Sequence, residues 1–128
     1  MTPITLTADV VIALHDEILN PGELRGLARD KSLEGALARV DNRLAYGMIS
    51  DVFELAASYA VVIAQGHCFN DGNKRTAFQA MDVCLDLNGV EIAWQGTETG
   101  DLIIRAAQGL LDEADLAQWL RMKAASGA

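Results

Sequence analysis

The sequence predicts a single all-α domain spanning residues 1–128, built as a compact bundle of about six helices. Apolar residues recur at helical spacing in segments that short connections separate. Both prolines, Pro3 and Pro21, lie early, so the backbone beyond Pro21 is free to form helices. The 128 residues, 51% hydrophobic and 22% charged, can bury one core and are too few for two.

The first helix is expected from about Thr7 to Leu19, and its apolar positions are Val10, Val11, Leu14 and Ile18. Asn20-Pro21-Gly22 ends it, because a residue before proline avoids the helical region. Residues Gly22 to Asp30 are predicted to form an irregular loop, a candidate flap over a bound target. A second helix is expected to begin near Ser32, a good N-cap, with Leu33, Ala36, Leu37 and Val40 on one face. Residues 42–47 either continue or end it.

The third predicted helix is capped by Ser50 or Asp51 and ends at Gly66. It is apolar nearly all round, which predicts the buried central helix of the bundle. A fourth helix is expected from about Gly72 or Asn73 to Leu87, where Asn88-Gly89 stops it. Its inward residues are Ala77, Ala80, Met81, Cys84 and Leu85.

The remainder of the chain is predicted to add a short extended piece at Val90–Ala93 and two more helices. These helices are expected near Gly100–Ala107 and Glu113–Met122, with Gly109 between them.

Charge and cysteine content narrow the class of protein. Ten basic and 18 acidic residues give a formal charge of -8, which argues against non-specific nucleic-acid binding and against an anionic membrane surface. We therefore expect no direct DNA binding and no membrane association. Two cysteines, no visible signal peptide and no sufficiently long apolar stretch predict a reduced, cytoplasmic protein.

Chemically distinctive residues gather between the two most hydrophobic helices, in the segment His67-Cys68-Phe69-Asn70-Asp71-Gly72-Asn73-Lys74-Arg75-Thr76. The start of a helix presents free backbone amides and a positive dipole end, and both favour an anion. Gly72 leaves room for a phosphate to approach, and Lys74 and Arg75 add cations. The segment therefore predicts a phosphate-binding helix start.

Two further residues of the segment suggest a reaction. Asp71 is a hard oxygen ligand that can hold a magnesium ion bridging phosphates. His67 can take a proton near neutral pH. The combination predicts phosphoryl or nucleotidyl transfer onto a hydroxyl, with His67 as the base.

Each residue also has a purely structural interpretation. A lone histidine is more often structural, Asp71 could cap the next helix, and Lys74 and Arg75 could be solvated charges. Phe69 is interpreted as a core anchor of the loop and Cys68 as an inert filler. The joint spacing of the segment favours the functional interpretation over these separate ones.

Two other site classes fit poorly. A phosphate-loop NTPase needs a glycine where His67 stands and a lysine directly after Gly72. A zinc site is unsupported, because the only other histidine, His15, is far away in sequence and no metal-ligand spacing occurs.

The pattern His67-x-Phe69-x-Asp71-Gly72-Asn73-Lys74-Arg75 resembles the signature of the Fic/Doc family, His-x-Phe-x-(Asp/Glu)-(Gly/Ala)-Asn-x-Arg. Within that family the chain is similar to the Doc (death-on-curing) toxins of toxin–antitoxin pairs. The supporting segments are Leu14-His15-Asp16, Arg25-Gly26-Leu27, Leu33 to Arg39 and Asp51 to Ala56. The resemblance covers about residues 8–90 and implies a helical fold with a catalytic loop between the central helix and the next.

The resemblance also implies a role for each signature residue. His67 would be the general base on the acceptor hydroxyl, and Asp71 would bind magnesium. The remaining roles are to line the anion hole (Gly72 and Asn73), to hold phosphates (Lys74 and Arg75) and to anchor the loop (Phe69).

Two departures from the common family pattern bear on the reaction. Lys74 stands where most AMP-transferring members have glycine, and Phe78 stands where they have a second arginine. Doc-type members share the lysine, which implies an inverted ATP whose γ-phosphate faces the acceptor. By this resemblance the reaction is phosphorylation of a threonine of elongation factor Tu with ATP and Mg²⁺, which arrests translation.

Regulation is expected from a partner. Ser50 to Glu54 is the nearest match to the family's self-inhibitory Ser/Thr-x-x-x-Glu-Gly/Asn, but Leu55 follows it and we interpret it as coincidence. The resemblance implies a cognate antitoxin whose C-terminal tail folds as a helix in a groove. Two alternatives stay open: an AMP or other nucleotidyl transferase, and a non-catalytic module that binds the antitoxin and helps repress its own operon.

Overall fold

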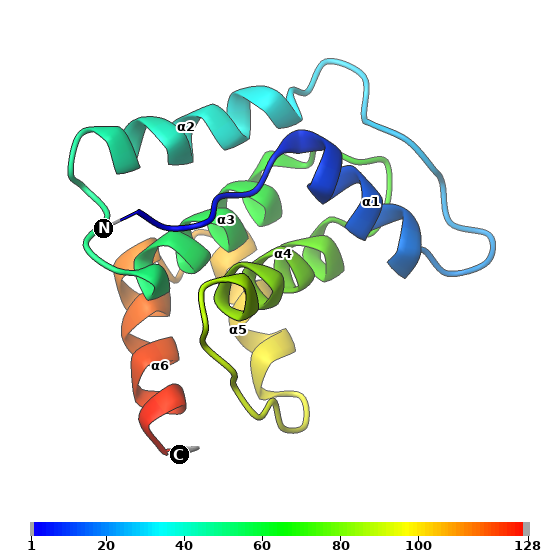
Figure 1. Cartoon of the computed structure of the whole chain (residues 1–128). Coiled ribbons are helices and arrows are strands. Elements are labelled where there is room, and N and C mark those ends of the chain that lie inside the picture. The colour runs from blue at the N-terminus through cyan, green and yellow to red at the C-terminus, as the bar shows by residue number, and fades with distance from the viewer. Residues whose placement is uncertain (1, 127–128) are drawn as a thin grey trace.

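The computed structural model describes residues 2–126, which form six α-helices and no β-strand (Figure 1). The helices are α1 (Ala8–Ile18), α2 (Leu33–Ala45), α3 (Val52–Gly66), α4 (Asn73–Leu87), α5 (Glu98–Ala107) and α6 (Glu113–Ser126). The predicted all-α bundle of about six helices is confirmed. None of these helices has both the length and the apolar character needed to cross a membrane.

Short polar side chains set the first residues of three helices, as the sequence suggested. Thr7 accepts a hydrogen bond from the Val10 amide at the start of α1. Ser32 and Asp51 do the same at α2 and α3, with donor–acceptor distances of 2.9 Å in both cases. These local bonds explain why the expected and observed starts agree so closely.

The structure refines three expectations from the sequence. Val10 is one of the apolar positions expected at helical spacing in the first helix, but it is 39% exposed, and Val11 and His15 are the buried residues of α1. Residues 90–93, where a short extended piece is expected, lie outside any helix and pair with no strand within the described residues. Of the two alternatives that the sequence left open for residues 42–47, the structure shows that residues 42–45 continue α2.

Helix α3 is the centre of the bundle and packs against α2, α4, α5 and α6 (Figure 1). Leu55, Tyr59 and Ile63 of α3 are fully buried, as are Met81 and Leu85 of α4. The loop between α3 and α4 therefore connects the two helices that carry much of the buried core. A site carried by this loop rests on two well-packed helices.

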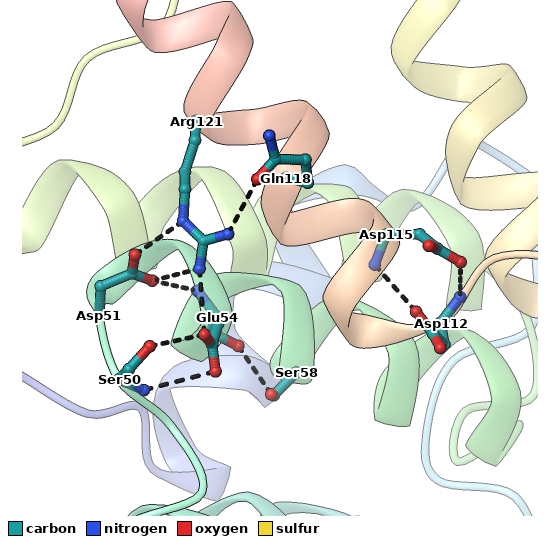
Figure 2. A network of polar contacts seen from close by, with 8 residues as sticks. All are labelled: Ser50, Asp51, Glu54, Ser58, Asp112, Asp115, Gln118 and Arg121. Atoms are coloured by element: carbon teal, nitrogen blue, oxygen red, sulfur yellow. Dashed lines mark hydrogen bonds and ion pairs between the residues drawn. The ribbon is translucent and has the colours of Figure 1, made fainter.

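A polar network fixes the other end of α3 to α6 (Figure 2). Arg121 donates to Asp51 Oδ2 at 2.8 Å and to Glu54 Oε1 at 3.0 Å, and Ser50 Oγ donates to the same oxygen at 2.6 Å. Burial alone would raise the pKa of Asp51, but the bonds from Arg121 and the Glu54 amide hold it below its usual value. Glu54 is thus a structural partner of Arg121 at the end of α3 away from His67, which agrees with interpreting the Ser50–Glu54 match as coincidence.

Two buried ionisable groups of the core, Tyr59 and Cys84, predict that the protein loses stability at alkaline pH. Burial raises the pKa of Tyr59, whose hydroxyl accepts the Leu6 amide at 2.9 Å, to about 12, and it raises the pKa of Cys84 to about 12. The ordinary values are 10.0 and 9.0, so the unfolded chain loses these protons first. The free energy of unfolding should therefore be retained below about pH 9 and fall between pH 9 and 12, by up to about 1.4 kcal/mol per pH unit for each group.

Urea denaturation at pH 8, 10 and 11 measures this decline. Cys84→Ala should make the free energy of unfolding fall less steeply with pH above pH 9. Tyr59→Phe should do the same above pH 10. Tyr59→Phe also removes the acceptor for the Leu6 amide, so it should lower stability by about 1 kcal/mol already at pH 8. Identical pH slopes in the wild type and both variants would contradict the prediction.

Candidate active site

The loop that joins α3 to α4 begins and ends in left-handed backbone conformations. His67, the residue that ends α3, has φ 49° and ψ 40°, and Gly72, which precedes the first residue of α4, has φ 78°. These two reversals turn the chain between helices that lie side by side in the core. They leave the imidazole of His67 exposed, close to the first turn of α4.

Phe69 holds this loop to the core. Its side chain is 2% exposed and stacks on the ring of His15, with 3.8 Å between ring centroids and 10° between ring planes. His15 is itself fully buried on α1, and its Nε2 donates to the Asp71 carbonyl at 2.7 Å. His15 thus supports the loop in two ways, by stacking on the Phe69 ring and by hydrogen bonding to the Asp71 carbonyl.

Asn73 closes the loop from the other side. Its side-chain nitrogen donates to the Phe69 carbonyl at 2.9 Å, and its oxygen accepts from the Phe69 amide at 3.0 Å. The side chain is therefore occupied by the loop backbone, so Asn73 can offer an anion its own backbone N–H and not its side-chain amide.

The first turn of α4 supplies unused donors. Thr76 is the first residue whose backbone N–H has an acceptor within the helix, the Gly72 carbonyl at 2.9 Å. The preceding amides, those of Asn73, Lys74 and Arg75, have no intrahelical acceptor by helix geometry. They form the positive end of a fifteen-residue helix, which suits an anion such as a phosphate.

A pocket of about 330 Å³ brings the signature residues together. It is lined by Ala64, His67, Asn70, Asp71, Gly72, Asn73, Lys74 and Arg75. Every sequence-predicted site residue except Phe69 lies on its wall, and Phe69 lies behind the loop. A side chain at Gly72 would meet the Arg75 guanidinium at 3.6 Å, so that group lies against the amide end of α4.

One carboxylate oxygen of Asp71 binds a segment that is distant in sequence, and the side chain does not cap α4. Its Oδ2 accepts the Leu24 amide at 2.7 Å, and no side chain caps α4. The structural alternative for Asp71, a helix cap, is therefore wrong. The donor set fits magnesium, which takes one or two carboxylates together with substrate phosphates. No cluster of three metal-ligating side chains occurs in residues 2–126, so a closed zinc-type site does not fit.

Residues 19–32, which include the irregular segment predicted at 22–30, run beside the loop between α3 and α4. The Asn70 amide donates to the Gly26 carbonyl at 3.1 Å, and the Ala28 amide donates to the Cys68 carbonyl at 2.7 Å. These bonds make a single antiparallel bridge between Leu27 and Phe69. The segment is thus fixed to the loop while Leu27 itself stays exposed.

Cys68 lies between these two segments and is 2% exposed. Burial raises the pKa of its thiol, so it stays protonated and weakly nucleophilic at neutral pH. This environment favours the interpretation of Cys68 as a filler.

Arg75 is held by α1 and the 19–32 segment, which the sequence did not indicate. Its Nη1 donates to the Ile18 carbonyl at 2.8 Å, and its Nη2 pairs with the Glu23 carboxylate. The hydrogen bond from Arg75, with a second from the Asn20 amide, lowers the pKa of Glu23 below its usual value. Glu23 therefore stays charged and competes with any phosphate for the guanidinium.

Glu23→Gln should raise the affinity for ATP about fivefold, because an uncharged amide no longer repels the triphosphate beside Arg75. Glutamine keeps the oxygen that can accept from Arg75 and Asn20, so the guanidinium stays in place. Isothermal titration with ATP measures the change, and Glu17→Gln on the exposed face of α1 is the matched control. Weaker binding in Glu23→Gln would instead show that the carboxylate helps binding by orienting Arg75.

Beyond Lys74 and Arg75 a mainly apolar groove of about 640 Å³ continues between α4 and α5. Phe78 lines it and packs edge-on against Trp94, with 5.1 Å between ring centroids and 74° between ring planes. Phe78 thus offers an apolar wall where an arginine would offer a phosphate clamp.

The comparisons with known proteins agree with this geometry. Residues 5–85 match the sequence model of the Fic/DOC family, a range that includes the whole loop and its signature. The chain is also 39% identical over 117 residues to the protein kinase doc of Escherichia phage P1. The aligned region covers 91% of this chain and 92% of that protein.

Proposed function

This chain belongs to the Fic/DOC family, and from that premise we propose that it is a kinase toxin that transfers the γ-phosphate of ATP to a protein hydroxyl. The observation that carries the proposal is one pocket that holds an exposed imidazole and an anion-binding helix start. A base and a phosphate cradle in one pocket suit phosphoryl transfer, in which catalysis is mostly positioning and charge stabilisation.

In the proposed reaction His67 removes the proton from the acceptor hydroxyl. The oxygen forms a bond to the γ-phosphorus as the bond between that phosphorus and the β,γ-bridging oxygen breaks, and ADP leaves. The free amides of α4, with Lys74 and Arg75, hold the charge of the phosphates. Asp71 would hold Mg²⁺, which supplies further neutralisation of phosphate charge when bound.

Nucleotidyl transfer is the competing reaction. Lys74 occupies the pocket wall where AMP-transferring relatives carry glycine, and Phe78 packs on Trp94 in place of a second arginine. These two residues favour transfer of the γ-phosphate over transfer of AMP.

For the acceptor we propose a threonine of elongation factor Tu, in the cytoplasm, with arrest of translation as the result. For regulation we propose a cognate antitoxin whose C-terminal tail docks as a helix. The apolar groove beside Lys74 and Arg75 supports this mode, because a helix seated there would cover both cations.

Transfer can be tested directly with purified elongation factor Tu, Mg²⁺ and ATP labelled at either the α- or the γ-phosphate. We expect the γ-label on the factor and a mass gain of one phosphate. The α-label with a mass gain of one AMP would establish nucleotidyl transfer instead. No mass gain, together with tight antitoxin binding, would support the non-catalytic module.

A further inference from the structure

A second polar pocket, of about 670 Å³, lies beside the candidate active site. The two pockets share the end of α3: Ala64 and His67 line the catalytic one, whereas Gln65, Gly66 and Cys68 line the second. A substrate whose hydroxyl reaches His67 is therefore bound at a residue that Gly66 and Cys68 of this second pocket flank in the sequence.

Three cations line the second pocket, Lys31 before α2 and Arg39 and Arg43 on α2. Asp30 and Glu113 also line it, so three positive and two negative charges leave one net positive charge. That local balance is opposite to the formal charge of -8 of the chain. Lys31 and Arg39 form no ion pair within residues 2–126, so both are available to a ligand.

Arg43 carries an unused donor in this pocket. Its Nη1 lies 3.4 Å from Glu113 Oε1, but its Nε is buried and has no hydrogen-bond partner. Among the described residues it is the one buried side-chain nitrogen or oxygen left in this state. A buried donor without an acceptor costs about 1–3 kcal/mol. Its burial also keeps this nitrogen out of reach of a ligand in the pocket, so Arg43 contributes there through its positive charge.

The charge of the pocket selects the ligand. One net positive charge suits a single carboxylate better than a phosphate dianion, because Asp30 and Glu113 would repel the second charge. Arginine forks match carboxylate oxygens, and the exposed guanidinium of Arg39 can supply such a fork. The start of α2 lies on the same wall and adds its positive dipole end.

We propose that this pocket binds an aspartate or glutamate side chain of the protein substrate, close to its acceptor hydroxyl, and so selects acceptor sites with an acidic neighbour. The proposal rests on the proposed phosphotransfer function. Arg39 and Lys31 act here as specificity-determining residues and take no part in the transfer itself.

Binding can be tested without any transfer reaction. Fluorescein-labelled hexaglutamate, hexaglutamine and hexalysine peptides are titrated with the full-length protein and followed by fluorescence anisotropy. We expect hexaglutamate alone to bind, and Arg39→Glu to weaken it about tenfold or more. Arg105→Glu is the matched control, since it makes the same charge change at an exposed arginine of α5 outside the pocket. Equal losses in both variants, no binding of hexaglutamate, or its displacement by inorganic phosphate would overturn the proposal.

Kinetics then decide whether the bound carboxylate belongs to the substrate. With elongation factor Tu as acceptor, Arg39→Glu should raise KM about tenfold and leave kcat and the KM for ATP unchanged. An unchanged KM together with weaker antitoxin binding would assign the pocket to the antitoxin and overturn the proposal. Absence of transfer even in the wild type would refute the proposed function, whereas a peptide that binds only when Arg39 is intact would still establish the carboxylate site.

Discussion

His67→Asn is expected to lower phosphate transfer by about 10²–10⁴-fold while the protein folds and binds ATP as before. His67 is the one histidine on the pocket wall, and its imidazole makes no hydrogen bond within the described residues. Its loss should therefore affect the reaction and not the fold. Growth arrest on expression should disappear in parallel.

Asparagine is the better replacement because of the backbone at this position. His67 has φ 49°, a conformation that asparagine tolerates and that costs alanine about 1 kcal/mol or more. A comparison of His67→Asn with His67→Ala thus separates lost catalysis from backbone strain, with the melting temperature as the second measurement. Transfer by His67→Asn at the rate of the wild type would show that another group takes the proton.

The helices were predictable because their signals are local. Ser32 and Asp51 cap the starts of α2 and α3 with their side chains. Gly66 and Asn88-Gly89 lie where α3 and α4 end. The choice between Val10 and Val11 was not local, because both are apolar neighbours and only the packing of α1 decides which one is buried. Val11 proved to be the core residue.

The site was predictable to the extent that it is contiguous in sequence. The signature from His67 to Arg75 is a single loop and helix start, so spacing alone could assemble it. Its supports come from elsewhere: His15 reaches the Asp71 carbonyl across 56 positions, and Glu23 reaches Arg75 across 52. A histidine four residues after the buried Val11, on the same helical face, was the one available signal for the first of these contacts.

These contacts make the proposed phosphate site depend on a segment that is remote from it in sequence. Leu24 binds the Asp71 carboxylate, Glu23 binds Arg75, and Gly26 binds the loop amide of Asn70. Residues 19–32 therefore neutralise part of the charge of Arg75 and hold the loop between α3 and α4 in position. Changes in this segment should alter nucleotide binding even though it supplies none of the signature residues.

Asp71→Asn is expected to lower transfer about 100-fold, equivalent to about 2.7 kcal/mol of lost transition-state stabilisation, because the proposed magnesium ligand loses its charge. The asparagine oxygen can still accept the Leu24 amide, so the link between the loop and residues 19–32 survives. The substitution thus separates the metal role of Asp71 from its structural role. Asp86→Asn, at an exposed carboxylate near the other end of α4, is the matched control.

Thermal denaturation with ATP, in the presence and absence of Mg²⁺, distinguishes the two roles. A ligand that binds only the folded state raises the melting temperature in proportion to its affinity. In the wild type and in Asp86→Asn the shift caused by ATP should grow when Mg²⁺ is added. In Asp71→Asn the Mg²⁺-dependent increment should vanish, whereas the shift due to the α4 amides, Lys74 and Arg75 should remain. Loss of the Mg²⁺-independent shift as well would mean that Asp71 serves the site by holding the loop and not by holding the ion.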